Sequence, residues 1–130
     1  MSRDLPQRPE PLPAPTTDAH THLLSTQEFS GLPVAELIER AAEVGVHRLV
    51  EVGCDLPSSR GAIEIAQNHP AVVACVAIHP NDAARAGDRL PAELDALEAL
   101  VAEGFRRPAA RLAAADNDNA RRHTASGFFC

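Results

Sequence analysis

Two short apolar runs, each followed by a helical pattern, constrain the fold of this 130-residue chain most strongly. The runs are VHRLVEVGC, residues 46–54, and AVVACVAI, residues 71–78. Both have the length of a strand, and the second is apolar throughout, as is typical of a strand buried on both faces. The sequence therefore predicts strands that alternate with helices around a parallel sheet, which is an α/β fold.

Three helices are expected, over residues 33–43, 55–70 and 89–104. The first and the third place apolar side chains three and four residues apart, so each has one apolar face. The second begins where Asp55 or Ser58 can accept a hydrogen bond from a free backbone N–H, which is the usual role of such residues before a helix. The helices therefore alternate with the strands along the chain.

The first strand is expected within residues 17–24, and residues 79–88, HPNDAARAGD, are expected to form a loop. The resulting order is strand, helix, strand, helix, strand, helix. This order fits a (β/α)8 barrel or a doubly wound sheet, because both are built from parallel strands joined by helices. The residues alone leave both architectures open.

Both ends of the chain lack the apolar period. Residues 1–15 hold five prolines among polar residues, a composition typical of a disordered leader. Residues 105–130 are rich in Ala, Arg and Asn without a period, so we expect an aperiodic tail that is disordered or frayed helix. The ordered domain is therefore expected over residues 16–104.

Composition narrows the classes of function. The net charge of −6 argues against a broad basic surface that binds nucleic acids. It is compatible with an enzyme that binds phosphate groups through metal ions, because the ions supply the positive charge. Cys54 and Cys75 lie in apolar runs, and the sequence has no Cys-x-x-Cys pair, so buried reduced thiols are expected. The sequence shows no signal peptide and no apolar run near the ~18 residues of a membrane span. We therefore expect a cytoplasmic protein with no membrane partner.

The stretch TTDAHTHLL, residues 16–24, is a candidate metal site. Side chains two residues apart on a strand point the same way, so His20 and His22 can reach one ion. Asp18 lies on the same side behind them and can orient an imidazole, the neutral form of which binds Zn²⁺ and other divalent transition metals. The pattern is short, and a pair of surface histidines at a strand end is the alternative.

Two more polar residues follow the other strands. Asp55 comes after the second strand and His79 after the third. In a parallel barrel the loops after the strands open on one face, so these residues would join His20 and His22 there as substrate or active-site contacts. Taken alone, Asp55 is better explained as a helix cap and His79 as a loop residue. Glu51 interrupts the second strand and is either a buried partner of another group or an outlier in the pattern.

The segments DAHTHL and AIHPN, together with the sequence between them, resemble the TatD family of metal-dependent hydrolases. The resemblance covers about residues 15–104. It implies the first three units of a TIM-like (β/α)8 barrel and a deoxyribonuclease or related phosphoester hydrolase that uses a divalent metal ion, Mg²⁺, Mn²⁺ or Zn²⁺. It also implies that His20 and His22 are metal ligands and that His79 contacts the substrate or the metal shell. DNA or another phosphoester is then the expected partner.

The sequence departs from the family in one respect. The family's fourth strand carries Gly-Glu-x-Gly-Leu-Asp, whose Glu binds metal, and later strands supply further ligands, but this chain contains no such motif. We therefore expect an incomplete barrel in a truncated, inactive form of the hydrolase. The alternative is a non-enzymatic interaction or binding module, whose exposed strand edges would be covered by a partner or by self-association.

Overall fold

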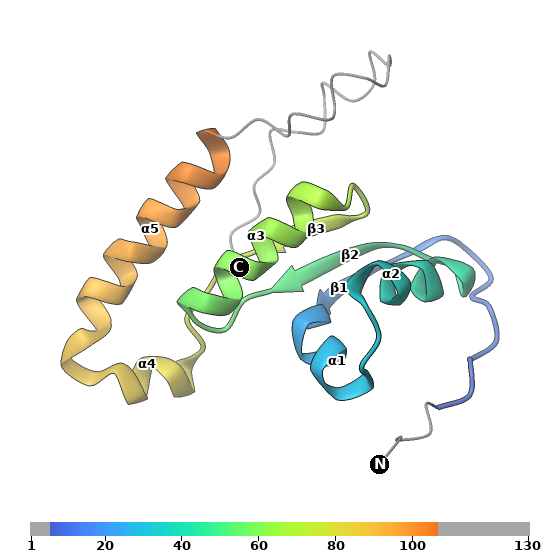
Figure 1. Ribbon diagram of the computed structural model, residues 1–130, viewed down its shortest axis with the longest axis horizontal. Helices are drawn as coiled ribbons and strands as arrows, with labels where there is room; N and C mark the ends of the chain where they lie inside the picture. The colour runs from blue at the N-terminus through green and yellow to red at the C-terminus, as the bar shows by residue number, and fades with distance from the viewer. Residues whose placement is uncertain (1–5, 107–130) are drawn as a thin grey trace.

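The structure, a computed structural model, describes residues 6–106. Its centre is a three-stranded parallel sheet in the order β1-β2-β3. The strands are β1 (Thr16–Thr21), β2 (Val46–Val52) and β3 (Val72–Cys75). Sequence neighbours are therefore sheet neighbours, joined by helical crossovers (Figure 1). This confirms the expected α/β fold, an open parallel sheet like the first three units of a TIM-like barrel.

Five α-helices and one short 3₁₀-helix accompany the sheet in the part of the chain that is described. They are α1 (Leu23–Ser30), α2 (Val34–Glu43), α3 (Leu56–Asn68), α4 (Pro80–Ala86), η1 (Gly87–Arg89) and α5 (Leu90–Arg106). Helices α2, α3 and α5 confirm the three helices expected from the sequence. Figure 1 shows α5 beside α3, on the side away from α1 and α2, and α3 and α5 are in contact.

The structure differs from the expectations in two places. The strand expected within residues 17–24 is present as β1, but it ends at Thr21, and helix α1, which begins at Leu23, was not expected. The segment 79–88 is not a loop but holds the short helix α4 and the first residues of η1. Helix α4 has local signals: His79 caps it, Pro80 occupies its first turn, and Gly87 follows it with a positive φ of 54°. Proline at a helix start and glycine after its end are typical helix boundaries.

The start of α3 forms the capping box that its sequence allows. The Ser58 N–H donates to Asp55 Oδ1 at 2.8 Å, and the Asp55 N–H donates to Ser58 Oγ at 3.0 Å. Two backbone donors with no partner inside the helix are satisfied in this way. Asp55 is therefore the helix cap, as its position after the strand suggested.

The apolar core lies between the sheet and the helices. Its buried centre consists of Leu23, Leu49, Ile65 and Val72. The apolar face of α2, which includes Leu37 and Ile38, packs against this centre as partly buried side chains. Cys75 is buried and Cys54 is half-buried, and neither forms a disulfide. The core therefore fixes the start of α1, through Leu23, against β2, β3 and α3.

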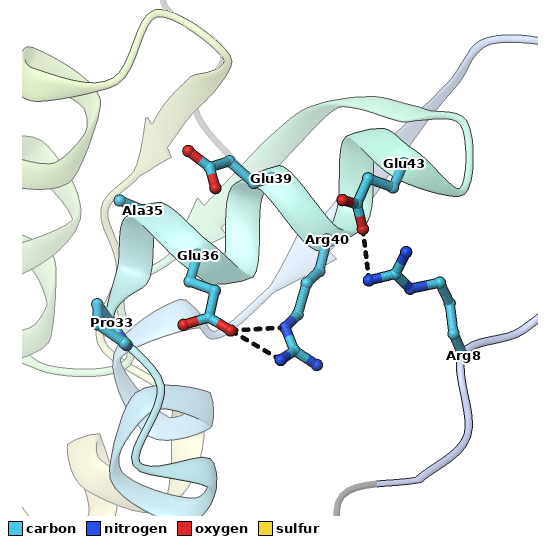
Figure 2. A pocket seen from close by; sticks show the side chains of 7 residues that line it. All are labelled: Arg8, Pro33, Ala35, Glu36, Glu39, Arg40 and Glu43. Carbon is cyan, nitrogen blue, oxygen red and sulfur yellow. Dashed lines mark hydrogen bonds and ion pairs between the residues drawn. The ribbon is translucent and has the colours of Figure 1, made fainter.

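The segment 6–15 has no regular secondary structure but contacts the end of α2. The Leu12 N–H donates to the Val44 carbonyl oxygen at 2.9 Å, and Arg8 forms an exposed ion pair with Glu43 at 2.6 Å. Figure 2 shows Arg8 and Glu43 among the side chains that line a pocket beside α2, where Arg40 also pairs with Glu36. Disorder of residues 1–15 in solution stays a prediction. The expected tail lies outside the described residues, except that α5 continues to Arg106.

Within residues 6–106, no helix is both long enough and apolar enough to cross a membrane.

Candidate metal centre

The carboxyl ends of the three strands bring the predicted site residues to one edge of the sheet. The side chain of His22, just after β1, bonds to the carbonyl of Val52, the last residue of β2. The His79 N–H, beyond β3, donates to the Cys54 carbonyl oxygen at 2.7 Å, one residue before Asp55. The ends of β1 and β3 are thus both tied to the end of β2.

The two histidine rings are in edge-to-face contact, with their centroids 5.1 Å apart. His20 is exposed and His22 is half-buried. The pairing of β1 with β2 becomes irregular between Asp18 and Thr21, just where His20 lies. Such a bulge redirects side chains locally, and bulges are common next to functional sites. The histidine pair therefore sits at one of the two irregular places in the ladder, the other being between Thr16 and Thr17 at the start of β1.

Hydrogen bonding fixes the protonation of the His22 ring. Its Nδ1 atom lies 2.8 Å from the Val52 carbonyl oxygen. A carbonyl oxygen can only accept, so Nδ1 carries the hydrogen and donates it. In the neutral ring Nε2 then has a free lone pair, which is the form that binds a metal ion. The His22 backbone is held as well, because its carbonyl oxygen accepts from the N–H and the hydroxyl of Thr26, at 2.9 and 2.8 Å.

Asp18 uses its carboxylate on the backbone. Oδ1 of Asp18 accepts a hydrogen bond from the His20 N–H at 3.0 Å. This bond spans the distorted part of β1 and helps to fix the backbone that carries His20. A role of Asp18 in orienting an imidazole ring stays a prediction.

His79 is oriented by the helix that it caps. The Asn81 N–H donates to Nδ1 of His79 at 3.2 Å, and the ring is exposed. Neutral His79 therefore carries its proton on Nε2 and can offer it to a bound group. The carboxylate of Asp55 is already engaged by Ser58, as described for α3. Both of these bonds use Oδ1 of Asp55, so that oxygen belongs to the helix cap.

Glu51 is the buried partner that one of the two sequence interpretations expected. Its side chain is 2% exposed, and its carboxylate accepts from the N–H groups of Leu23, at 2.5 Å, and Leu24, at 3.3 Å. Burial raises the pKa of Glu51 above its ordinary value, and the two backbone hydrogen bonds and the nearby His22 offset only part of that effect. An ionisable group this deeply buried requires such hydrogen bonds.

Ser59 was not expected from the sequence as a contributor to this edge. It is fully buried, and its hydroxyl bonds both the N–H and the carbonyl of Ala77 at 3.2 Å. These two hydrogen bonds hold the segment that leads to His79 against the first turn of α3. Gly53 allows it, because a Cβ there would lie 2.3 Å from Ser59 Oγ. No pattern in the sequence marks a buried serine of this kind.

A metal ion would meet an incomplete set of ligands here. Among residues 6–106, no three His, Cys, Asp or Glu side chains come together so that they could hold an ion. The two imidazoles of His20 and His22 fit a divalent ion as donors, because both are at the sheet edge and His22 presents Nε2. A catalytic zinc site usually has three protein ligands and one open position. The described residues thus provide part of such a site.

Comparison with known proteins gives one family match. The model of the family described as TatD related DNase matches residues 17–108. The chain is 42% identical over 82 residues to "Uncharacterized metal-dependent hydrolase TatD" of Mycobacterium tuberculosis (strain ATCC 25618 / H37Rv), which covers 63% of this chain and 31% of that protein. It is 37% identical over 90 residues to "Uncharacterized metal-dependent hydrolase YabD" of Bacillus subtilis (strain 168), which covers 67% of this chain and 34% of that protein.

The chain spans about a third of the length of these curated relatives. No solved structure matches it significantly.

Proposed function

The chain belongs to the TatD related DNase family, and on that premise we propose that it takes part in the metal-dependent hydrolysis of phosphodiester bonds, with DNA as the substrate class. His20 and His22 hold a divalent ion at the carboxyl edge of the sheet. The observation that carries the proposal is the bond from His22 Nδ1 to the Val52 carbonyl oxygen at 2.8 Å. It leaves Nε2 as a neutral ligand atom in a fixed direction.

A divalent ion supplies this reaction with an activated water molecule and with positive charge for the phosphate. The ion is Mg²⁺, Mn²⁺ or Zn²⁺, and imidazole ligands favour the transition metals among these. The net charge of −6 makes an ion all the more necessary, because the chain as a whole repels a polyanion. His79 assists as a donor: its Nε2–H contacts a phosphate oxygen of the substrate.

The ligand set of residues 6–106 is too small for catalysis by itself. Two imidazoles leave most of the coordination positions to water, so the ion is held weakly and without a fixed geometry. We therefore propose that the 130-residue chain alone does not cleave DNA measurably. The remaining ligands come from residues outside the described range, from polypeptide beyond these 130 residues, or from another chain.

The outer sides of β1 and β3, the two lateral edges of the sheet, are where such polypeptide would join the sheet. Among the described residues, β1 and β3 each pair with β2 alone. Unpaired strand edges are templates for further strands. We propose that they are covered either by more β/α units or by self-association. Light scattering coupled to size-exclusion chromatography tests the second case, since a monomer at all concentrations contradicts it.

The test of the proposed function is a calorimetric titration with Zn²⁺ and with Mn²⁺. The chain should bind weakly, and binding should disappear when His20 and His22 are both replaced by Ala. His47→Ala is the matched control, because His47 is an exposed histidine at the start of β2, at the opposite end of the sheet. Binding that survives the double replacement would place the ion elsewhere and overturn the proposal.

A nuclease assay with the same ions accompanies the titration. No metal-dependent cleavage is expected from the chain alone. Cleavage by the wild type that is lost in His22→Ala would support the function but contradict the proposed inactivity of this chain.

A further inference from the structure

The Glu51 carboxylate has no part in the ligand set, yet it bonds to the backbone N–H of Leu23, the residue directly after His22. It is one of two buried polar or charged residues in the described part of the chain, and its side chain is 2% exposed. The strand around it is otherwise apolar between Leu49 and Val52. Burying a carboxylate is costly unless hydrogen bonds compensate it. The two bonds that do so both come from the start of α1.

Helix α1 needs an external acceptor at its start. The first backbone N–H groups of a helix have no partner within it, and a side chain at the N-cap position usually accepts from them. Here the N-cap is His22, which makes no such bond, because its ring donates to Val52 instead. Glu51, a residue of β2, serves as the acceptor instead. Its two oxygens accept from the N–H groups of Leu23 and Leu24 at 2.5 and 3.3 Å.

This arrangement holds the backbone on both sides of His22. Before His22, Thr21 pairs with Glu51 in the parallel ladder. After His22, the Leu23 N–H donates to the Glu51 carboxylate. Glu51 therefore acts on both sides of the point at which β1 ends and α1 begins, in addition to the two bonds from Thr26 to the His22 carbonyl oxygen. That point sets the direction of the Cα–Cβ bond of His22, and with it the approach of the ring to the Val52 carbonyl.

We propose that Glu51 is a positioning residue for His22 and acts through the backbone of residues 21–24. The proposal rests on the proposed function only in so far as His22 is a metal ligand. Glu51 is not itself a third ligand. Its two oxygens already accept from the N–H groups of Leu23 and Leu24, and within residues 6–106 it does not join the two histidines in a group that could hold an ion.

Two variants separate positioning from folding. Glu51→Gln keeps the shape and one acceptor oxygen, so it should retain the bond to Leu23 and bind Zn²⁺ within about threefold of the wild type. Glu51→Leu removes both acceptors and keeps an apolar filling. It should lower the affinity about tenfold, the lower end of the loss seen when a group that orients a metal ligand is removed. Glu64→Gln, at an exposed position of α3, is the control and should change nothing.

The decisive readout needs no metal. Nitrogen-15 shifts of the histidine rings report which ring nitrogen carries the proton. In wild type and Glu51→Gln the neutral His22 ring should be protonated at Nδ1. In Glu51→Leu this preference should be lost, while the rings of His47 and His79 stay unchanged. An unchanged His22 tautomer in a folded Glu51→Leu variant, with unchanged Zn²⁺ affinity, would overturn the proposal.

If Glu51→Leu does not fold, Glu51→Gln decides by itself. The Leu23 amide proton then donates to a neutral oxygen instead of a buried carboxylate, so its resonance should move upfield, and the His22 ring resonances should move with it. A shift of the Leu23 amide without any response from the His22 ring would refute positioning. If the wild type binds no Zn²⁺ while the ring signals respond as expected, the proposed function fails and the positioning role stands.

Discussion

The Nδ1 atom of His22 lies 2.8 Å from the carbonyl oxygen of Val52, and this bond joins the ends of two neighbouring strands. The acceptor is a backbone atom, so no side-chain pattern in the sequence identifies it. The bond defines the tautomer of His22 and restrains the ring. It makes the two histidines unequal: His22 is anchored and half-buried, whereas His20 is exposed.

The first prediction concerns this inequality. His22→Ala should weaken Zn²⁺ binding about tenfold or more, and His20→Ala should weaken it less. An anchored ligand loses little freedom when it binds an ion, whereas the exposed ring of His20 must be ordered first. Calorimetric titration of both single variants measures the difference. Equal losses, or a larger loss for His20→Ala, would show that the Val52 bond does not preorganise the site.

A second prediction separates the two roles considered for Asp55. Its carboxylate accepts from the Ser58 N–H at 2.8 Å, so Asp55→Ala should lower the free energy of unfolding by about 1 kcal/mol. Asp55→Asn keeps a capping oxygen and should cost about half of that or less. Urea denaturation measures both. Zn²⁺ affinity should be unchanged in either variant, and a clear loss of affinity would restore Asp55 as an active-site contact.

A third prediction tests the packing below His79. In Gly53→Ala the new Cβ would lie 2.3 Å from Ser59 Oγ and 2.6 Å from Ser59 Cα. Because the second of these atoms belongs to the backbone, the strand end must shift, at a cost of about 2–3 kcal/mol.

Gly104→Ala is the matched control for that substitution. Gly104 lies in α5, and among the described residues the new Cβ would contact Ile63 of α3, at an ordinary 3.5 Å. It should therefore stabilise the chain by about 0.5–1 kcal/mol, because alanine favours the helix more than glycine does. Similar denaturation midpoints for the two variants would contradict the close contact at Gly53.

The helices show what the sequence could and could not predict. The apolar period of α2 and the capping residues of α3 are local, so they were visible in the sequence. Helix α1 lacks a local cap, because its first N–H groups bond to Glu51, 28 residues further along the chain. Its start therefore depends on tertiary structure. The sequence of TTDAHTHLL alone predicted a strand there and gave no sign of the helix that follows. Helix α4 did carry local signals, Pro80 and Gly87, but its seven residues are too few for an apolar period.

The candidate site divides in the same way. The i, i+2 spacing placed His20 and His22 side by side, and the structure brings their rings into contact. The position of His79 after a strand placed it at the same edge of the sheet. The groups that hold these residues were not foreseen, because the Val52 carbonyl and the Ser59 hydroxyl act through contacts between distant segments. Residue types reveal which groups can do chemistry, and the tertiary fold supplies what orients them.

The last prediction follows from the burial of Glu51, which raises the pKa of its carboxyl group in the folded chain. A carboxyl with a higher pKa in the folded state binds its proton more tightly there than in the unfolded state. Its contribution to stability is therefore complete below the unfolded pKa, about 4.3, and is lost as the pH rises through the folded pKa. Glu51→Gln cannot titrate, so the free energy of unfolding of the wild type, minus that of the variant, should fall as the pH rises from 4 to 7. Urea denaturation at several pH values, with a chelator to exclude metal ions, measures this difference. Glu64→Gln is the control, because the Glu64 side chain is exposed. The free energy of unfolding of the wild type, minus that of this variant, should show no such trend. A difference that rises with pH would mean that the bonds from Leu23 and Leu24 outweigh burial and that Glu51 is held as a carboxylate at low pH.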